Sequence, residues 1–353
     1  MSQHTIPCTS ILTMVQKEKI KAWIYQKPGI HHAVEYLSSE FNIQITSDPD
    51  VVKSFERDAS NLPGNAEILC HPVNDEECAL ILSYCRIAKI PLTIAAGRTN
   101  LNGSATPNGG IVMSIEKMTQ PGPQVDLKIG CISTPVGIYL EDMRNAALQQ
   151  SHNKLYFPVD PTSRREAMIG GTISCNASGF VPGPAGSIRF WIESLDFLTP
   201  DGYKISCKRG QYISEKGKFI LNYPDGPVEW EVPTYPRPNI KNASGPYSDE
   251  KGIIDLVDFL VGSEGIFGLI TSVTFKLKEM PSDFLDLFFT LPSEQHAVQF
   301  HNYMYEFFDG DLSQITALEY FGFNCQNYMD HREELFLSDL DVGIYLQLPL
   351  YEQ

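Results

Sequence analysis

A glycine-bearing turn between two apolar runs is the part of the sequence best suited to chemistry. Residues 90–120 contain an apolar run at Ile90–Ile94, a small turn at Ala95–Asn100, a second loop that begins near Gly103, and another apolar run at Ile111–Ile115. In this strand–loop–strand order, glycine tolerates a positive φ and lets backbone N–H groups surround an anion. The glycines alone are equally typical of two plain connections in an α+β domain.

Two later blocks are rich in the same small and polar residues. Residues 157–179 read FPVDPTSRREAMIGGTISCNASG, and residues 259–271 read FLVGSEGIFGLIT. Taken in order with the first stretch, these blocks resemble the FAD-binding domain of the vanillyl-alcohol oxidase/p-cresol methylhydroxylase (PCMH) superfamily. The most similar branch contains FAD-linked oxidases such as glycolate oxidase and D-lactate dehydrogenase. The resemblance covers about residues 45–350.

The resemblance implies an α+β fold, with a two-subdomain FAD-binding domain of the PCMH type followed by an incomplete antiparallel α+β cap domain. We expect an N-terminal helical segment over residues 1–60, the FAD-binding domain over 61–280, and the start of the cap over 281–353. A segment from Lys241 to Tyr247 also resembles the family wording KN-x-x-GY, with a proline inserted before the tyrosine.

The resemblance further implies FAD as the cofactor, with the GSEG block contacting its adenosine half. The positions carried over from the family blocks are Ala95, Ala96, Gly97, Arg98, Thr99, Asn100, Gly103, Pro158, Asp160, Gly170, Gly171, Thr172, Ser174, Asn176, Gly179, Gly186, Ser187, Glu264, Gly265, Gly268 and Ile270. Covalent members of the family attach the flavin through a histidine. No histidine lies between His71 and His152, so we expect non-covalent FAD.

Two residues of the first loop lead to specific expectations. At Gly97, a Cβ should clash either with the backbone at positive φ or with the approaching pyrophosphate. Arg98 replaces a family glycine, and it fits equally well as a pyrophosphate partner or as a solvent-facing side chain.

Local patterns predict several of the elements around these blocks. Asn74 has the character of an N-cap, and Cys78, Ile81, Leu82 and Cys85 form one helical face that Pro91 ends. We also expect a hairpin within 121–133 and a helix starting at Thr134-Pro135. A strand over 192–198 should end at a Pro-Asp-Gly turn.

Further along, we expect glycine- and serine-rich loops over 169–179 and an irregular excursion over 208–240. A helix over 253–261 should precede a strand over 272–278.

The cap should begin with a strand at 284–291, a helix that starts after Ser293 and runs to Phe308, and a strand at 315–321. The sequence ends in an apolar, strand-like run at 342–350. We expect this run to leave an open hydrophobic sheet edge. A second subunit or a homo-oligomer would then complete the cap.

Composition limits the classes of function. The formal charge of −16 argues against nucleic acid as a partner, because phosphate binding requires clustered Lys and Arg. No apolar run reaches the roughly 18 residues of a membrane span, and the N-terminus does not resemble a signal peptide. The eight scattered cysteines lack metal-site spacing and indicate a reducing, cytoplasmic compartment.

The resemblance implies an oxidoreductase that acts on a CH–OH group, with a small 2-hydroxy acid of the D-lactate or glycolate type as substrate. His296 and His301 would not face together on a helix, so no metal site is expected and no catalytic base is assigned. Three alternatives stay open: an aldonolactone or sugar oxidase, an alkylglycerone-phosphate synthase-like branch, and a non-catalytic flavin-binding subunit.

Overall fold

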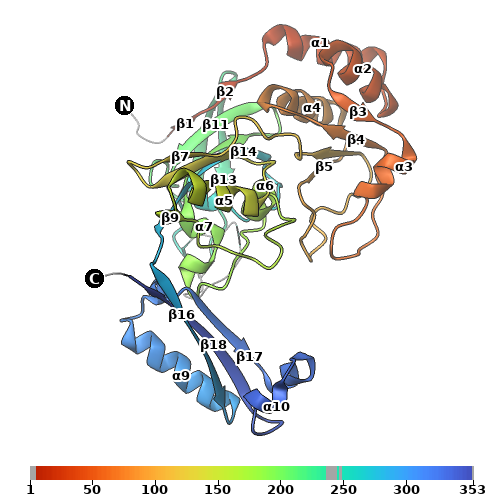
Figure 1. Ribbon diagram of the computed structural model, residues 1–353. Coiled ribbons are helices and arrows are strands. Elements are labelled where there is room, and N and C mark those ends of the chain that lie inside the picture. The colour runs from red at the N-terminus through yellow and green to blue at the C-terminus, as the bar shows by residue number, and fades with distance from the viewer. Residues whose placement is uncertain (1–4, 236–244, 246–248, 352–353) are drawn as a thin grey trace.

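A main body and a smaller cap make up the protein (Figure 1). The computed structural model describes residues 5–235, 245 and 249–351. The N-terminal helices α1 (Met14–Gln26) and α2 (His31–Phe41) lie at one end of the main body, and the cap extends from the other end. In the part of the chain that the structure describes, no helix is long and apolar enough to cross a membrane.

The first sheet of the main body has four strands in the order β3 (Gln44–Thr46), β4 (Ile68–His71), β6 (Ile111–Ser114) and β5 (Leu92–Ala95). The strands β4, β6 and β5 run parallel, and β3 is antiparallel to β4. The two apolar runs of the first block are therefore neighbouring parallel strands. The connection that joins them therefore runs from the carboxyl end of β5 back to the amino end of β6.

Helix α4 (Asp75–Ala88) precedes β5 and confirms the capping prediction. The Asn74 side chain accepts a hydrogen bond from the Glu77 backbone N–H at 2.9 Å. The predicted face is buried, and α1 and α2 pack against the same helix. Lys89 adopts a left-handed conformation and ends the helix two residues before Pro91.

The second sheet has six antiparallel strands. Their order is β2 (Thr9–Ser10), β11 (Tyr203–Lys208), β10 (Ile192–Leu198), β14 (Leu269–Lys276), β8 (Cys131–Pro135) and β7 (Gln124–Asp126). The predicted strand at 192–198 and the hairpin within 121–133 are confirmed. The alternation in β14 is also confirmed, because Val273 and Phe275 are buried while their neighbours are partly exposed.

Two local predictions near the site are wrong. Thr134-Pro135 ends strand β8, which pairs with β14, and the helix α5 (Leu140–Gln150) begins five residues later. A proline suits the end of a strand as well as the start of a helix, so the pattern was ambiguous. Residues 169–174 form the short helix α6 (Ile169–Ser174) and not a loop. The glycines let this helix pack tightly, since a Cβ on Gly170 would lie 2.4 Å from the Ile115 side chain.

The region 208–240 is more regular than expected. Strands β12 (Lys218–Tyr223) and β13 (Gly226–Glu231) form a hairpin, and β12 also pairs with β1 (Thr5–Pro7). Burial of Phe219 and Leu221 holds the hairpin on the main body. Apart from Gly245, the segment from Lys241 to Tyr247 lies outside the described residues. The predicted helix at 253–261 is shorter, as α8 (Leu256–Leu260) capped by Asp255.

The cap is a three-stranded antiparallel sheet with one helix on one face. Its strands are β16 (Asp283–Leu291), β18 (Val342–Leu350) and β17 (Ala317–Phe321), in that order. Helix α9 (Glu294–Phe307) follows its predicted N-cap, Ser293. The expectation of an open edge at 342–350 is wrong, because β18 is the central strand and pairs on both sides. The edges of the sheet are β16 and β17.

The remaining elements are short. They are α3 (Pro49–Val52), η1 (Lys53–Phe55), β9 (Leu155–Tyr156), η2 (Pro184–Gly186), α7 (Ile188–Trp191), β15 (Lys278–Glu279), η3 (Leu312–Gln314), η4 (Phe323–Tyr328) and α10 (Arg332–Leu335). The cap meets the main body through a backbone hydrogen bond of 3.2 Å from the Leu318 N–H to the Phe180 carbonyl.

Candidate cofactor site

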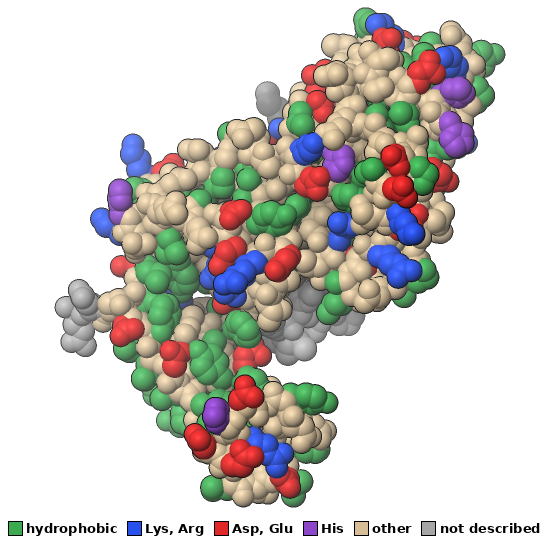
Figure 2. Space-filling model, turned by 45° about the vertical axis from the view of Figure 1, so that its right-hand side comes forward, with side chains coloured by type: hydrophobic (Ala, Val, Ile, Leu, Met, Phe, Trp, Pro, Cys, Tyr) green, Lys and Arg blue, Asp and Glu red, His purple; other side chains and the backbone are tan. Residues whose placement is uncertain are grey.

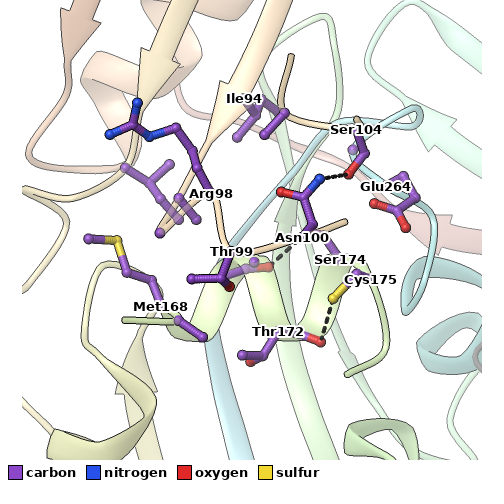
Figure 3. Close-up of a pocket in the computed structure, with 18 of the residues that line it drawn as sticks. Ile94, Arg98, Thr99, Asn100, Ser104, Met168, Thr172, Ser174, Cys175 and Glu264 are labelled. Carbon is purple, nitrogen blue, oxygen red and sulfur yellow. Dashed lines mark hydrogen bonds between the residues drawn. The ribbon is translucent and has the colours of Figure 1, made fainter. Parts of the chain in front are cut away.

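The three sequence blocks converge on one pocket between the two sheets (Figure 3). The loop after β5 forms one wall, α6 forms another, and the loop before β14 closes the third side. Each wall comes from a loop or a short helix fixed at the end of a strand. This arrangement explains why segments far apart in the sequence meet.

Thirteen of the predicted site residues line this pocket. They are Ala96, Gly97, Arg98, Thr99, Asn100, Gly170, Gly171, Thr172, Ser174, Glu264, Gly265, Gly268 and Ile270. Ten further lining residues were not predicted, namely Ile94, Ser104, Ala105, Ile115, Ser163, Ala167, Met168, Cys175, Ala177 and Leu269. Ser163 and Met168 are side chains within the second block, so the block itself was a usable signal for them.

The chemistry of the lining fits a dinucleotide cofactor. Hydroxyl and amide groups of Thr99, Asn100, Thr172 and Ser174 are neutral hydrogen-bonding groups, and glycine and alanine leave the backbone accessible. Neutral donors and exposed backbone N–H groups can hold a diphosphate without a cationic side chain. The cavity of about 140 Å³ encloses a segment of an extended ligand and not a whole dinucleotide.

Arg98 does not reach toward the pocket centre. Its guanidinium lies over the Phe55 ring, with the guanidinium carbon 4.1 Å from the ring centroid, and it donates to the Ser54 carbonyl. Burial lowers the pKa of this guanidinium. Arg98 is therefore not a free solvent-facing side chain. Its contact with a pyrophosphate stays a prediction. Its backbone has a positive φ of 56°.

Gly97 is required for a different reason from the one expected. Its φ lies outside the left-handed region, and a Cβ would lie 2.1 Å from the Glu166 carbonyl oxygen. The positive φ values between β5 and β6 occur instead at Arg98, Gly103, Gly109 and Gly110. Gly97 thus permits close packing of the first loop against the second block. The prediction of a clash at positive φ is wrong.

Eight predicted site residues do not line this pocket. They are Ala95, Gly103, Pro158, Asp160, Asn176, Gly179, Gly186 and Ser187. Several of them hold the wall behind the pocket. The Asn176 carboxamide oxygen accepts a 3.0 Å hydrogen bond from the Arg189 N–H, and a Cβ on Gly179 would lie 2.5 Å from Asp160. FAD contact at all of the carried-over positions stays a prediction.

Asp160 lies where the wall meets the cap. Its carboxylate accepts a 3.3 Å hydrogen bond from the Phe180 N–H, and the Phe180 carbonyl binds the cap strand β17. Burial raises the pKa of Asp160, while the Phe180 hydrogen bond and the nearby Arg144 and Arg164 partly oppose that rise.

The run from Arg57 to Ser60 resembles the family's RDAS segment, but Asp58 was not included in the predicted site. Asp58 is buried, at 6% exposure, and its carboxylate binds the side chain of Asn100 in the pocket wall. The family-like run of Asp58, Ala59 and Ser60 was the available signal. The contact between Asp58 and Asn100, more than forty residues apart, cannot be predicted from the spacing of nearby residues.

Comparison with known proteins agrees with this geometry. Residues 66–208 match the family described as FAD binding domain. The chain is 30% identical to the D-lactate dehydrogenase of Archaeoglobus fulgidus over 65% of this chain and 43% of that protein. It is 24% identical to the D-2-hydroxyglutarate dehydrogenase of Xanthomonas citri pv. viticola, covering 71% of this chain and 45% of that protein.

Glycolate oxidase subunit GlcD of Bacillus subtilis is 26% identical, over 60% of this chain and 36% of that protein. The chain therefore spans less than half the length of these three curated relatives. A solved alkyldihydroxyacetonephosphate synthase shares the fold, with a TM-score of 0.63 at 14% identity over 92% of this chain and 56% of that protein.

The two sheets, the pocket between them and the matched region define an FAD-binding domain of the PCMH type, whose cofactor is FAD. The chain is similar to D-lactate dehydrogenase and glycolate oxidase, in agreement with the resemblance seen in the sequence blocks.

Proposed function

We propose that the protein is an FAD-dependent oxidoreductase that oxidises a 2-hydroxy acid of the D-lactate or glycolate type. The observation that carries this proposal is the pocket with a glycine- and hydroxyl-rich lining, found in a chain whose relatives are named for D-lactate, D-2-hydroxyglutarate and glycolate. When bound, FAD supplies a ring that accepts a hydride from the substrate carbon.

The chain's own residues orient the cofactor and shield it. Thr99 offers a hydroxyl donor to its diphosphate, whereas the Thr172 and Ser174 hydroxyls donate to the Ile169 and Gly170 carbonyls and hold α6 in shape. The glycines of α6 allow the backbone to approach closely. Ile94, Ile115 and other apolar lining side chains exclude water from the enclosed segment. No catalytic base is assigned.

We propose that FAD is held without a covalent bond. Among the described residues, no histidine lines the pocket, and Cys175 is the one thiol there. Burial raises the pKa of Cys175 to about 11, so the nucleophilic thiolate is scarce near neutral pH. Acid precipitation of the purified holoprotein should leave the flavin in the supernatant. Flavin that stays with the polypeptide would contradict this proposal.

We propose further that the cap is completed by another polypeptide or by a second copy of the chain. Figure 2 shows hydrophobic side chains gathered where the cap joins the main body. Beside this junction, a groove of about 1130 Å³ lies between α9 and the segment around Pro184. Phe190, Val298 and Tyr305 line the groove and are exposed. Large apolar surfaces of this kind are typical of interaction sites.

A second candidate is a non-catalytic flavin-binding subunit. It stays open because no catalytic base is assigned among the residues that line the pocket. An aldonolactone or sugar oxidase and an alkylglycerone-phosphate synthase-like enzyme also stay open, since the likeness to the synthase shows the fold alone.

The deciding experiment is anaerobic mixing of the FAD-loaded chain with D-lactate, D-2-hydroxyglutarate and glycolate in turn. Bleaching of the visible flavin absorbance by one of these acids, and not by its L-isomer where one exists, supports the dehydrogenase. Bound FAD that stays oxidised with all three acids rejects it for this chain alone. Restored bleaching after addition of a partner polypeptide would support the two-component form.

We propose that the chain divides at residues 60 and 280 into an N-terminal segment, the FAD-binding domain and the cap. The N-terminal segment packs closely on the main body, because its strands β1, β2 and β3 join the sheets there. A cytoplasmic location is also proposed. It is supported by the eight cysteines, which are all free, and seven of them are buried or half-buried.

A further inference from the structure

Asp58 is a buried carboxylate with no part in the function proposed above. It follows the short helix η1 and accepts two hydrogen bonds from Ser60, at 3.0 Å from the backbone N–H and 2.5 Å from the hydroxyl. These two bonds form a local turn of a kind that many aspartates make. By themselves they indicate no ligand.

The second oxygen of the same carboxylate binds the cofactor loop. It accepts a 2.6 Å hydrogen bond from the Asn100 side-chain amide and a 3.2 Å bond from the Ala105 backbone N–H. Both donors belong to the loop that lines the pocket. Burial alone would raise the pKa of Asp58, but the bonds from Ser60, Asn100 and Ala105 hold it below its usual value.

Three acceptors surround the Asn100 amide nitrogen, namely Asp58, Asn102 and Ser104, and the Asp58 carboxylate is the nearest and the charged one. The nitrogen faces Asp58 and also lies 3.1 Å from the Ser104 hydroxyl. Figure 3 shows this nitrogen turned toward Ser104 and the amide oxygen turned the opposite way. An asparagine held in this orientation presents an acceptor, and not a donor, to a ligand in the pocket.

A second acceptor, Glu264, lies beside this loop (Figure 3). The Asn102 amide donates a 3.1 Å hydrogen bond to Glu264, whose backbone is held at a φ of 52°. This bond joins the loop of the first sheet to the loop before β14 in the second sheet. Asn100 and Glu264 thus form an acceptor-rich side of the pocket. Such a side repels a phosphate and suits a group that donates hydrogen bonds.

We propose that Asp58 is a positioning residue for FAD: it orients the Asn100 amide so that Asn100, together with Glu264, accepts a hydrogen bond from a sugar hydroxyl of the cofactor. FAD carries hydroxyls on its ribose and on its ribitol chain, and both have this chemistry. The diphosphate then lies away from these two acceptors, near Thr99, whose hydroxyl can donate. This inference rests on FAD binding and not on the proposed substrate.

The first test is the FAD dissociation constant of Asp58→Asn, measured by quenching of flavin fluorescence in the apoprotein. The substitution keeps the shape of the side chain but replaces one carboxylate oxygen with an amide N–H₂ donor, which can then face the N–H₂ donor of Asn100. We expect FAD binding to weaken by about ten- to a hundredfold, the range for a lost hydrogen bond to a charged group. The apoprotein is also melted without FAD, so that a loss of folded protein is measured separately.

Asp311→Asn is the matched control. Asp311 makes the same local turn, accepting from Ser313 at 3.0 Å from the backbone N–H and 2.5 Å from the hydroxyl, but it lies in the cap. Its substitution should leave the FAD dissociation constant unchanged. Equal weakening by both substitutions would mean that any such turn matters for the fold, and would overturn the proposal.

A double-mutant cycle separates positioning from general stability. If Asp58 acts through Asn100, Asn100→Ala should weaken FAD binding by a similar factor, and Asp58→Asn should then add less than about twofold. Unchanged affinity in Asn100→Ala, or independent effects that multiply, would overturn the proposal. Competition by ADP, which contains the ribose but not the ribitol, identifies the hydroxyl. If Asp58→Asn weakens ADP binding as much as FAD binding, the hydroxyl is on the ribose. If the affinity for ADP is unchanged, the hydroxyl is on the ribitol chain.

Discussion

Gly97 allows a very close backbone approach in the wall of the pocket. An added Cβ would lie 2.1 Å from the Glu166 carbonyl oxygen, and that oxygen belongs to backbone that cannot rotate away. Gly97→Ala should therefore separate the first loop from the second block. We expect the free energy of unfolding of the apoprotein to fall by about 1–3 kcal/mol, as for other overpacked sites, with weaker FAD binding as a consequence.

Urea unfolding of the apoprotein measures this change. Gly322→Ala is the control, because Gly322 has a φ of −64° and the nearest atom to its added Cβ is 3.5 Å away. An unchanged unfolding midpoint in Gly97→Ala, together with weaker FAD binding, would instead support the original idea of a clash with the cofactor.

Buried thiols make the stability of the protein sensitive to alkali. Burial raises the pKa of Cys85 and of Cys207 to about 12. A raised pKa in the folded state means that the folded protein holds the proton more tightly than the unfolded chain. The stabilisation of the folded state that results from this pKa difference is therefore fully present below about pH 9. It is lost as the pH rises toward 12, by up to about 1.4 kcal/mol per thiol for each pH unit.

Urea unfolding at pH 8, 9 and 10 gives this slope. Cys207→Ala should make the free energy of unfolding decrease less steeply with pH, by the amount that one thiol contributes. Replacement of the exposed Cys325 should leave the slope unchanged. Equal slopes in the two variants would show that the Cys207 thiol ionises alike in the folded and unfolded states.

At the scale of elements, helix caps offer a comparison within one molecule. Asn74 caps α4 with a 2.9 Å hydrogen bond to the Glu77 N–H, whereas the Ser293 side chain makes no cap bond to α9 and binds His296 instead. Asn74→Ala should lower the free energy of unfolding by about 1 kcal/mol. Ser293→Ala should have a smaller effect, and a larger effect would contradict the cap assignment.

Elements whose signals are local could be predicted from the sequence. The cap of α4, strand β10 with its turn, and the alternation in β14 depend on residues within a few positions, and all three are confirmed. Thr134-Pro135 failed because proline fits both a helix start and a strand end. The pairing of β8 with β14, some 140 residues away in sequence, decided between them.

The same limit applies to the site. The glycine blocks could be recognised as short motifs, but their partners could not. The direction of Arg98 depends on packing against Phe55, and the role of Asp58 depends on a contact 42 residues away. The pairing of β18 with both β16 and β17 is likewise non-local. Residue types and spacing predict which loops meet, whereas side-chain directions follow from tertiary packing.

At the scale of the whole molecule, the cap exposes more apolar surface than its own sheet can cover. Helix α9 buries one face on the sheet, yet Tyr303 and Phe307 on another face are 62% and 66% exposed. Their rings stack at 6.2 Å. Beyond the helix, Leu337 is 99% exposed. Because β18 is the central strand, this helix surface is a better candidate interface than the chain-terminal strand.

We therefore expect the purified chain to associate through α9. The net charge of −16 opposes self-association at low ionic strength, so sedimentation should show larger species as salt screens the repulsion. Tyr303→Ser combined with Phe307→Ser should restore a monomer at high salt. The matched control replaces Met14 and Val15, which are equally exposed on α1 in the main body, and should leave association unchanged. A wild-type monomer at high salt that turns over D-lactate, glycolate or D-2-hydroxyglutarate would reject both the interface and the need for a partner.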